Sequence, residues 1–157
     1  MKRWFAPMAL GTVLIAGVAL AQDQGQAAVL ASVQAFTDAV NREDIPAALS
    51  HFTANPSIIE DLAPYRFAGP EAGANWIKAM GDNAEAHGVT GIEMKLSPAT
   101  RVDVLADRAY AIVPALLTFT MKDGRRQTAA DTLTFALQRS DAGWKIDAFT
   151  WTGMSPK

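Results

Sequence analysis

The spacing of apolar residues along this chain changes near Thr90, and that change limits the folds open to it. Before Thr90 they recur at steps of three and four residues, which is typical of an amphipathic helix. The positions concerned are Val29, Val33, Phe36 and Val40. After Thr90 apolar and polar residues alternate, which is typical of a half-buried strand. We therefore expect helices first and strands afterwards.

Two more helices are expected before the spacing changes. Asp44 can cap a short helix, in whose first turn Pro46 is tolerated. The third helix is expected to open at residues 69–71, with proline at its first position, and to end at Gly88. The segment between the second and third helices is expected to form a short hairpin.

Four long antiparallel strands are expected from Thr90 onward, joined by turns such as Asp123-Gly124. Pro114 lies inside the longest of them, residues 109–121, and cannot donate a backbone hydrogen bond. A bulge or an edge position is therefore expected at this proline. Helices followed by antiparallel strands predict an α+β layer fold, in which the sheet curls over the helices.

The amino-terminal residues resemble a secretory signal peptide. Lys2 and Arg3 precede an apolar run, and the run ends in the small-x-small pattern Ala19-Leu20-Ala21. A membrane anchor is the alternative, but the run is shorter than the roughly 20 residues that span a bilayer. We expect cleavage before Gln22 and a periplasmic or secreted product that is not attached to a membrane.

The remainder of the chain carries no linker rich enough in Pro, Gly or Ser to separate two domains. The expected organisation is a signal peptide over residues 1–21, a short tail over 22–26, one domain over 27–153 and a C-terminal tail over 154–157.

Charge and residue types exclude several classes of function. Without the leader the chain has 12 basic and 16 acidic residues, so its net charge is 12 − 16 = −4. Nucleic acid is not expected as a partner, because phosphate backbones require a clustered basic face. The chain has no cysteine and only two histidines, His51 and His87, neither at metal-ligand spacing. No metal or cofactor is expected, and no serine lies in a Gly-x-Ser-x-Gly elbow.

Two groups of acids are candidate functional residues. In "SIIED" (57–61), Glu60 and Asp61 are adjacent, so a strand with one buried side must point one of them inward. Asp131 shares a face of its strand with Leu133 and Phe135. It lies either at the strand's end near solvent or in a pocket, where desolvation would raise the pKa of its carboxyl.

Aromatic residues are the candidates for binding an apolar ligand. They line a cavity or belong to the ordinary core, and their spacing allows both. The candidate ligand-binding residues are Phe36, Tyr65, Phe67, Trp76, Phe135 and Trp151.

Two stretches, "VQAFTDAVNREDIPAALSHFTANPSIIED" and the closing "GWKIDAFTW", resemble the nuclear transport factor two-like superfamily. That superfamily includes ketosteroid isomerases, scytalone dehydratase and the SnoaL-like cyclases. The resemblance implies a cone-shaped α+β barrel, with three N-terminal helices packed in the concave face of a curved, mostly antiparallel sheet. It also implies a homodimer that pairs through the sheet.

The resemblance implies a reduced ketosteroid isomerase site. The general base falls on Asp61, whereas the tyrosine of the oxyanion hole falls on Phe36 and its second donor near Leu133. Asp131 lies two residues before Leu133 on the same face. Losing one oxyanion donor typically costs about 10² to 10³ in rate, which disfavours the usual enolisation.

Three functions remain open because a fold does not define an activity. The first is a binding module for a small, largely apolar organic molecule. The second is a cyclase, dehydratase or isomerase that uses Asp61 as general base and Asp131 or Tyr65 to stabilise charge. The third is a dimerising interaction module without a ligand.

Overall fold

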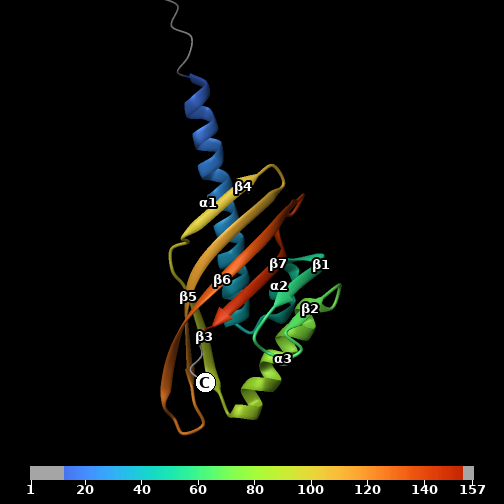
Figure 1. Cartoon of the computed structure of the whole chain (residues 1–157), viewed down its shortest axis with the longest axis vertical. Helices are drawn as coiled ribbons and strands as arrows, with labels where there is room; N and C mark the ends of the chain where they lie inside the picture. Colours follow the sequence, from blue (N-terminus) through green and yellow to red (C-terminus); the bar gives the residue numbers. More distant parts are fainter. Residues whose placement is uncertain (1–12, 154–157) are drawn as a thin grey trace, which may run out of the picture.

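The computed structural model describes residues 13–153 and contains three helices and seven strands in that range (Figure 1). In chain order they are α1 (Val13–Asn41), α2 (Ile45–Ser50), β1 (Phe52–Ile59), β2 (Arg66–Ala68), α3 (Ala72–His87), β3 (Thr90–Leu96), β4 (Arg101–Leu105), β5 (Arg108–Thr120), β6 (Arg126–Ser140) and β7 (Gly143–Gly153). The expected α+β class is confirmed.

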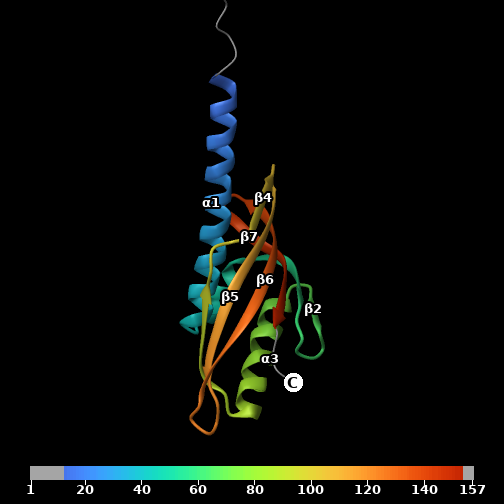
Figure 2. The ribbon, with the colours of Figure 1, turned by 60° about the vertical axis from the view of Figure 1, so that its left-hand side comes forward.

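The seven strands form one sheet in the order β2-β1-β7-β6-β5-β3, and β4 also pairs with β5. Every pair is antiparallel except β1 with β7, which is parallel. The sheet curves without closing, and α1 runs along it while α3 lies beside β1 and β2 (Figure 2). The cone-like arrangement of helices and curved sheet agrees with the resemblance.

The start of α2 and the end of α3 follow the residues expected to set them, whereas α3 begins at Ala72, so Pro70 precedes the helix and is not its first residue. The Asp44 side chain accepts a hydrogen bond of 3.1 Å from the Ala47 backbone N–H and caps α2. Helix α3 ends at Gly88, whose φ of 64° is left-handed and therefore suits glycine.

Strand β4 was missed in the sequence, where only four strands were expected after α3. Its residues alternate between exposed and half-buried, so it has no fully buried face to give a clear signal. On one side of β5, Pro114 faces the segment between β3 and β4, where the Ser97 N–H donates a hydrogen bond to the Pro114 carbonyl. On the other side, the pairing of β5 with β6 keeps its register at Pro114. The proline therefore occupies a local edge and makes no bulge.

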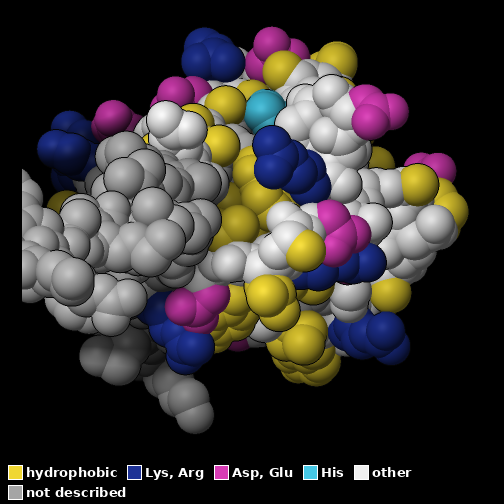
Figure 3. Space-filling model, turned by 90° about the horizontal axis from the view of Figure 1, so that it is seen from above, with side chains coloured by type: hydrophobic (Ala, Val, Ile, Leu, Met, Phe, Trp, Pro, Cys, Tyr) yellow, Lys and Arg dark blue, Asp and Glu magenta, His cyan; other side chains and the backbone are white. Residues whose placement is uncertain are grey.

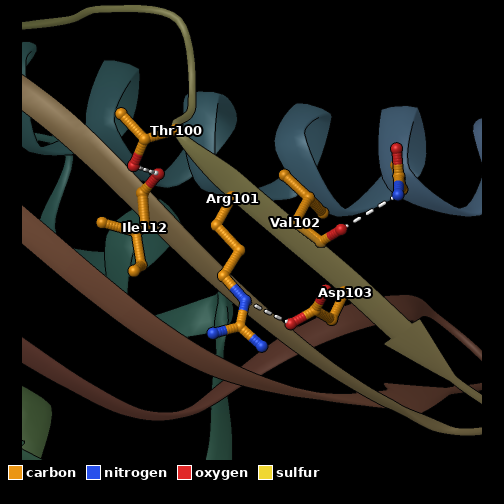
Figure 4. A network of polar contacts seen from close by, with 6 residues as sticks. Thr100, Arg101, Val102, Asp103 and Ile112 are labelled. Carbon is orange, nitrogen blue, oxygen red and sulfur yellow. Dashed lines mark hydrogen bonds and ion pairs between the residues drawn. The ribbon is translucent and has the colours of Figure 1, made fainter.

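Helix α1 is joined to β4 near the start of the packed domain. The Gln26 side-chain amide donates a 2.9 Å hydrogen bond to the Val102 carbonyl, and Arg101 pairs with Asp103 at 2.6 Å on the same strand (Figure 4). A Cβ at Gly25 would lie 3.4 Å from the side chain of Val104. The residues expected to form a short tail thus continue α1 and contact the sheet.

The cleavage position expected after Ala21 lies within the continuous helix α1, while residues 1–12 lie outside the described part. No helix within residues 13–153 is both long enough and apolar enough to cross a membrane. Viewed from above, hydrophobic side chains show between charged ones that are scattered over this face (Figure 3).

The core between the helices and the sheet is aromatic at its centre. The ring of Phe149 lies 4.9 Å from that of Trp76 and 5.7 Å from that of Phe135, measured between centroids. Phe36 of α1 contacts the same cluster, with its centroid 5.3 Å from that of Phe52. Such offset and edge-on contacts stabilise a core beyond the area they bury. This cluster supports one wall of the candidate site.

Candidate functional site

An irregularity in β1 decides which carboxylate points inward. Residues 52 and 57 of β1 pair with residues 146 and 148 of β7, so β1 contains extra residues between these two positions. Beyond the irregularity, Pro56, Ile58 and Glu60 are buried while Ile59 is exposed. Because strand side chains alternate, Glu60 follows Ile58 into the interior and Asp61 is exposed.

The Glu60 carboxyl is held by two hydrogen bonds. The indole Nε1–H of Trp76 donates to its Oε2 at 3.2 Å, and the Asp61 backbone N–H donates to its Oε1 at 3.2 Å. Glu60 is 8% exposed and Trp76 is fully buried. These partners fix the carboxyl without neutralising it, because neither carries a positive charge.

Burial raises the pKa of Glu60 from an ordinary value of 4.5 to about 7. Desolvation is the largest cause, since a charged carboxylate loses hydration there. Asp61 adds to the rise, whereas the hydrogen bond from Trp76 opposes it. The carboxyl therefore changes protonation state near neutral pH.

Glu60 lines a cavity of about 760 Å³ between the end of α1, α3, β3 and the β6–β7 part of the sheet. Most of the residues around it are apolar. They include Val40, Ile77, Met80, Met94, Leu117, Phe119 and Trp151. The acids on its wall are Glu43, Glu60, Asp61 and Asp131. The arrangement is an apolar cavity with a few polar groups, which is the usual form of a small-molecule site.

Asp131 of β6 is 6% exposed and belongs to this cavity. It pairs in register with Gly153 of β7, and Leu133, two residues further on, pairs with Trp151. The sequence allowed Asp131 to lie near solvent at the end of its strand or in a pocket, and the structure places it in the pocket.

The sequence-predicted residues divide into two sets. Asp61, Asp131 and Trp151 come together around the cavity. Phe36, Phe67, Trp76 and Phe135 belong to the buried core behind it, and Tyr65 is 64% exposed in the turn that links β1 to β2. The roles given to these residues stay predictions.

Asn41 and the apolar residues of α3 and β3 were missed as part of the site. The Asn41 side chain donates to the Met94 carbonyl at 2.7 Å and accepts from the Met94 N–H at 2.9 Å, so it pairs with the edge of β3 as a strand would. The apolar spacing of α3 signals a buried face, but it does not show that this face borders an open space.

Within residues 13–153, no group of three His, Cys, Asp or Glu side chains is placed to hold a metal ion. His51 packs edge-on against Phe36, and burial is the main cause that lowers its pKa, with Lys145 adding to the effect.

Solved structures share this fold. A ketosteroid isomerase-like protein from Erwinia carotovora is 24% identical, with a TM-score of 0.65 over 83% of this chain and 97% of the other. An NTF2-like protein with a cystatin-like fold from Novosphingobium aromaticivorans is 18% identical, with a TM-score of 0.68 over 96% and 94%. A nuclear transport factor 2-like superfamily protein from Salmonella enterica is 14% identical, with a TM-score of 0.68 over 86% and 94%.

No protein-family model matches the sequence, and no curated protein is similar enough to match it. The structural likenesses therefore define the fold: this chain has the nuclear transport factor two-like fold, as its resemblance implied.

Proposed function

We propose that this protein binds a small, largely apolar organic molecule in the cavity between the end of α1, α3 and the sheet. The observation that carries the proposal is an apolar cavity of about 760 Å³ with the buried carboxyl of Glu60 on its wall. Ligand sites commonly measure roughly 300 to 1,000 Å³ and place a few polar groups on apolar walls.

The buried carboxyl of Glu60 favours a ligand-binding cavity over a mere defect in core packing. Carboxylates are almost never fully buried without a compensating interaction, because the charged form loses its hydration. An apolar residue at position 60 would continue the pattern of Pro56 and Ile58 at no such cost. Glu60 is instead positioned by Trp76, which suits a group that meets a polar atom of the ligand.

Native mass spectrometry of the purified protein tests the proposal. An added small mass that disappears on denaturation is expected. Gly81 of α3 lines the cavity and has open space around the position of its Cβ, so Gly81→Trp should fill the cavity and remove the added mass. Ala86→Trp on an exposed part of the same helix is the control and should retain it. An added mass that survives in Gly81→Trp contradicts the proposed site.

A second candidate, catalysis by proton transfer, is favoured by the titration of Glu60. A general base works best with a pKa near the operating pH, and the pKa of Glu60 is about 7. Either Glu60 or Asp61 would take a proton from a carbon acid or hydroxyl. It would return this proton to the cyclised product or, in a dehydration, to the departing hydroxyl, which leaves as water. Phe36 has no hydroxyl to complete the oxyanion hole of a ketosteroid isomerase, so a cyclase or dehydratase fits better.

Carboxylate-to-amide variants separate binding from catalysis once the mass has been identified. Glu60→Gln and Asp61→Asn each keep the size of the side chain but cannot accept a proton. For an enzyme, one of the two should abolish turnover while binding persists. For a binding protein, no turnover of the ligand should be seen in the wild type or in either variant, and the variants should change only the affinity for the ligand.

A further inference from the structure

We infer that the cavity is selective for organic cations, namely protonated amines carried on an apolar body. This inference rests on the proposed function and names the class of its ligand. It follows from the sign of the charges on the cavity wall, from the apolar residues between them and from the position of Trp151.

All four ionisable residues on the cavity wall are acids. Glu43 comes from the turn after α1, Glu60 and Asp61 from the end of β1, and Asp131 from β6. No lysine, arginine or histidine lines the cavity in the described part of the chain. A carboxylate or phosphate ligand would therefore add a negative charge among acids, whereas an amine would bring the opposite charge.

Two basic side chains on the surrounding elements pair with acids outside the cavity. Lys78 of α3 lies 2.6 Å from Asp82, and Arg126 of β6 lies 3.7 Å from Glu93. Both pairs are exposed on the surface. Neither of these two cations is therefore directed at the cavity.

Trp151 lies on the cavity wall between two of the acids. Strand β7 separates β1, which carries Glu60, from β6, which carries Asp131. Neighbouring strands are about 4.8 Å apart, and Asp131 pairs with Gly153, two residues beyond Trp151. The backbones of the two acids therefore lie roughly 12 Å apart on a diagonal across β7, with Trp151 on the strand between them. A tryptophan ring attracts a cation placed over its face, and an ammonium group here would meet a carboxyl on either side.

The apolar part of the ligand would contact side chains of α3 and of the neighbouring strand β5. Ile77 and Met80 of α3 and Leu117 and Phe119 of β5 line this part of the cavity. A free inorganic cation would leave this surface uncovered, and no metal-binding group of three side chains is present within residues 13–153. An amine on a compact hydrocarbon body matches both parts of the cavity.

Three probes with one rigid apolar body test the inference: adamantylamine, adamantanol and adamantane carboxylate. Their dissociation constants are measured at pH 8 by calorimetry on the whole protein. The amine should bind at least about tenfold more tightly than the alcohol, because one carboxylate near an ammonium group contributes at least that much at partial burial. The carboxylate should bind most weakly.

The double variant Glu60→Gln, Asp131→Asn replaces two carboxyl groups by amides without a large change in shape. It should bring the affinity for the amine to within about twofold of that for the alcohol, because the Coulomb attraction is lost. Glu85→Gln changes an exposed acid of α3 outside the cavity and serves as the control, with no change expected. Circular dichroism of each variant checks that it is folded.

The outcomes separate the inference from the proposed function. If the alcohol or carboxylate binds as tightly as the amine and Gly81→Trp abolishes that binding, the cavity binds ligands and the preference for cations is refuted. If none of the probes binds, or if Gly81→Trp leaves their binding unchanged, the proposed site itself is refuted. Amine preference that persists in the double variant also refutes the inference.

Discussion

Replacing Glu60 by glutamine should affect the stability of the protein more favourably at pH 8 than at pH 5. The folded state holds a proton on Glu60 up to a pKa of about 7, whereas the ordinary value is 4.5. Below pH 4.5 both states hold the proton. As the pH rises through 4.5 to 7, the unfolded state ionises first, so the wild-type protein loses stability in that window. Glutamine does not titrate and avoids this loss.

The size of the effect follows from the pKa difference. One pKa unit corresponds to about 1.4 kcal/mol, so the shift from 4.5 to about 7 corresponds to about 3 kcal/mol for a fully enclosed group. The cavity is open to solvent on one side, which reduces this figure to roughly 2 kcal/mol between pH 5 and pH 8. For a domain of this size, roughly 2 kcal/mol changes the melting temperature by about 8 °C.

Urea unfolding of the wild type and Glu60→Gln at pH 5 and pH 8 measures this effect directly. Glutamine has one acceptor oxygen for the two donors, the Trp76 indole N–H and the Asp61 N–H, so one of these bonds is lost at both pH values. The effect of the substitution is therefore judged by the change between the two pH values. Glu85→Gln, an exposed acid on α3, is the control and should track the wild type. The reasoning fails if the stability difference between Glu60→Gln and the wild type is the same at pH 5 and pH 8.

Three further substitutions test the framework around the cavity by their free energies of unfolding. Asn41→Ala removes both hydrogen bonds to Met94 and should cost about 2 to 3 kcal/mol, and the β3 amide hydrogens should exchange faster. An unchanged exchange rate would mean that these two hydrogen bonds do not hold β3 in place. Gly73→Ala places a Cβ 2.9 Å from Phe52 and should cost about 1 to 3 kcal/mol, whereas a neutral result would mean that α3 shifts freely. Asp44→Ala removes the cap of α2 and should cost about 1 kcal/mol, and Asp44→Asn should restore most of it.

The general fold could be predicted because its signals are local. Steps of three and four residues before Thr90 and alternation after it predicted the helices and the long strands, and Asp44 and Gly88 marked helix ends that the structure confirms. Strand β4 was not predicted because neither of its faces is fully buried. Signal-peptide cleavage after Ala21 and pairing of two copies through the sheet stay predictions.

The site could be predicted only in part, because it depends on contacts between distant segments. Alternation showed that one of Glu60 and Asp61 faces inward, but the choice depends on the irregularity between residues 52 and 57, which only the pairing with β7 reveals. Trp76 has the same helical spacing whether it lines a cavity or fills the core. The structure shows it in the core, where it donates to the carboxyl that reaches the cavity.

Because Glu60 and Asp61 are adjacent at the end of β1, the cavity would keep a carboxyl even if the preceding segment of β1 changed in length by one residue. Inserting or deleting one residue between positions 52 and 57 would invert the alternation beyond it, turning Glu60 outward and Asp61 inward. A carboxyl would then still face the cavity, one methylene shorter. A change of one residue in the length of this segment would therefore alter the reach of the acid into the cavity and keep a carboxyl there.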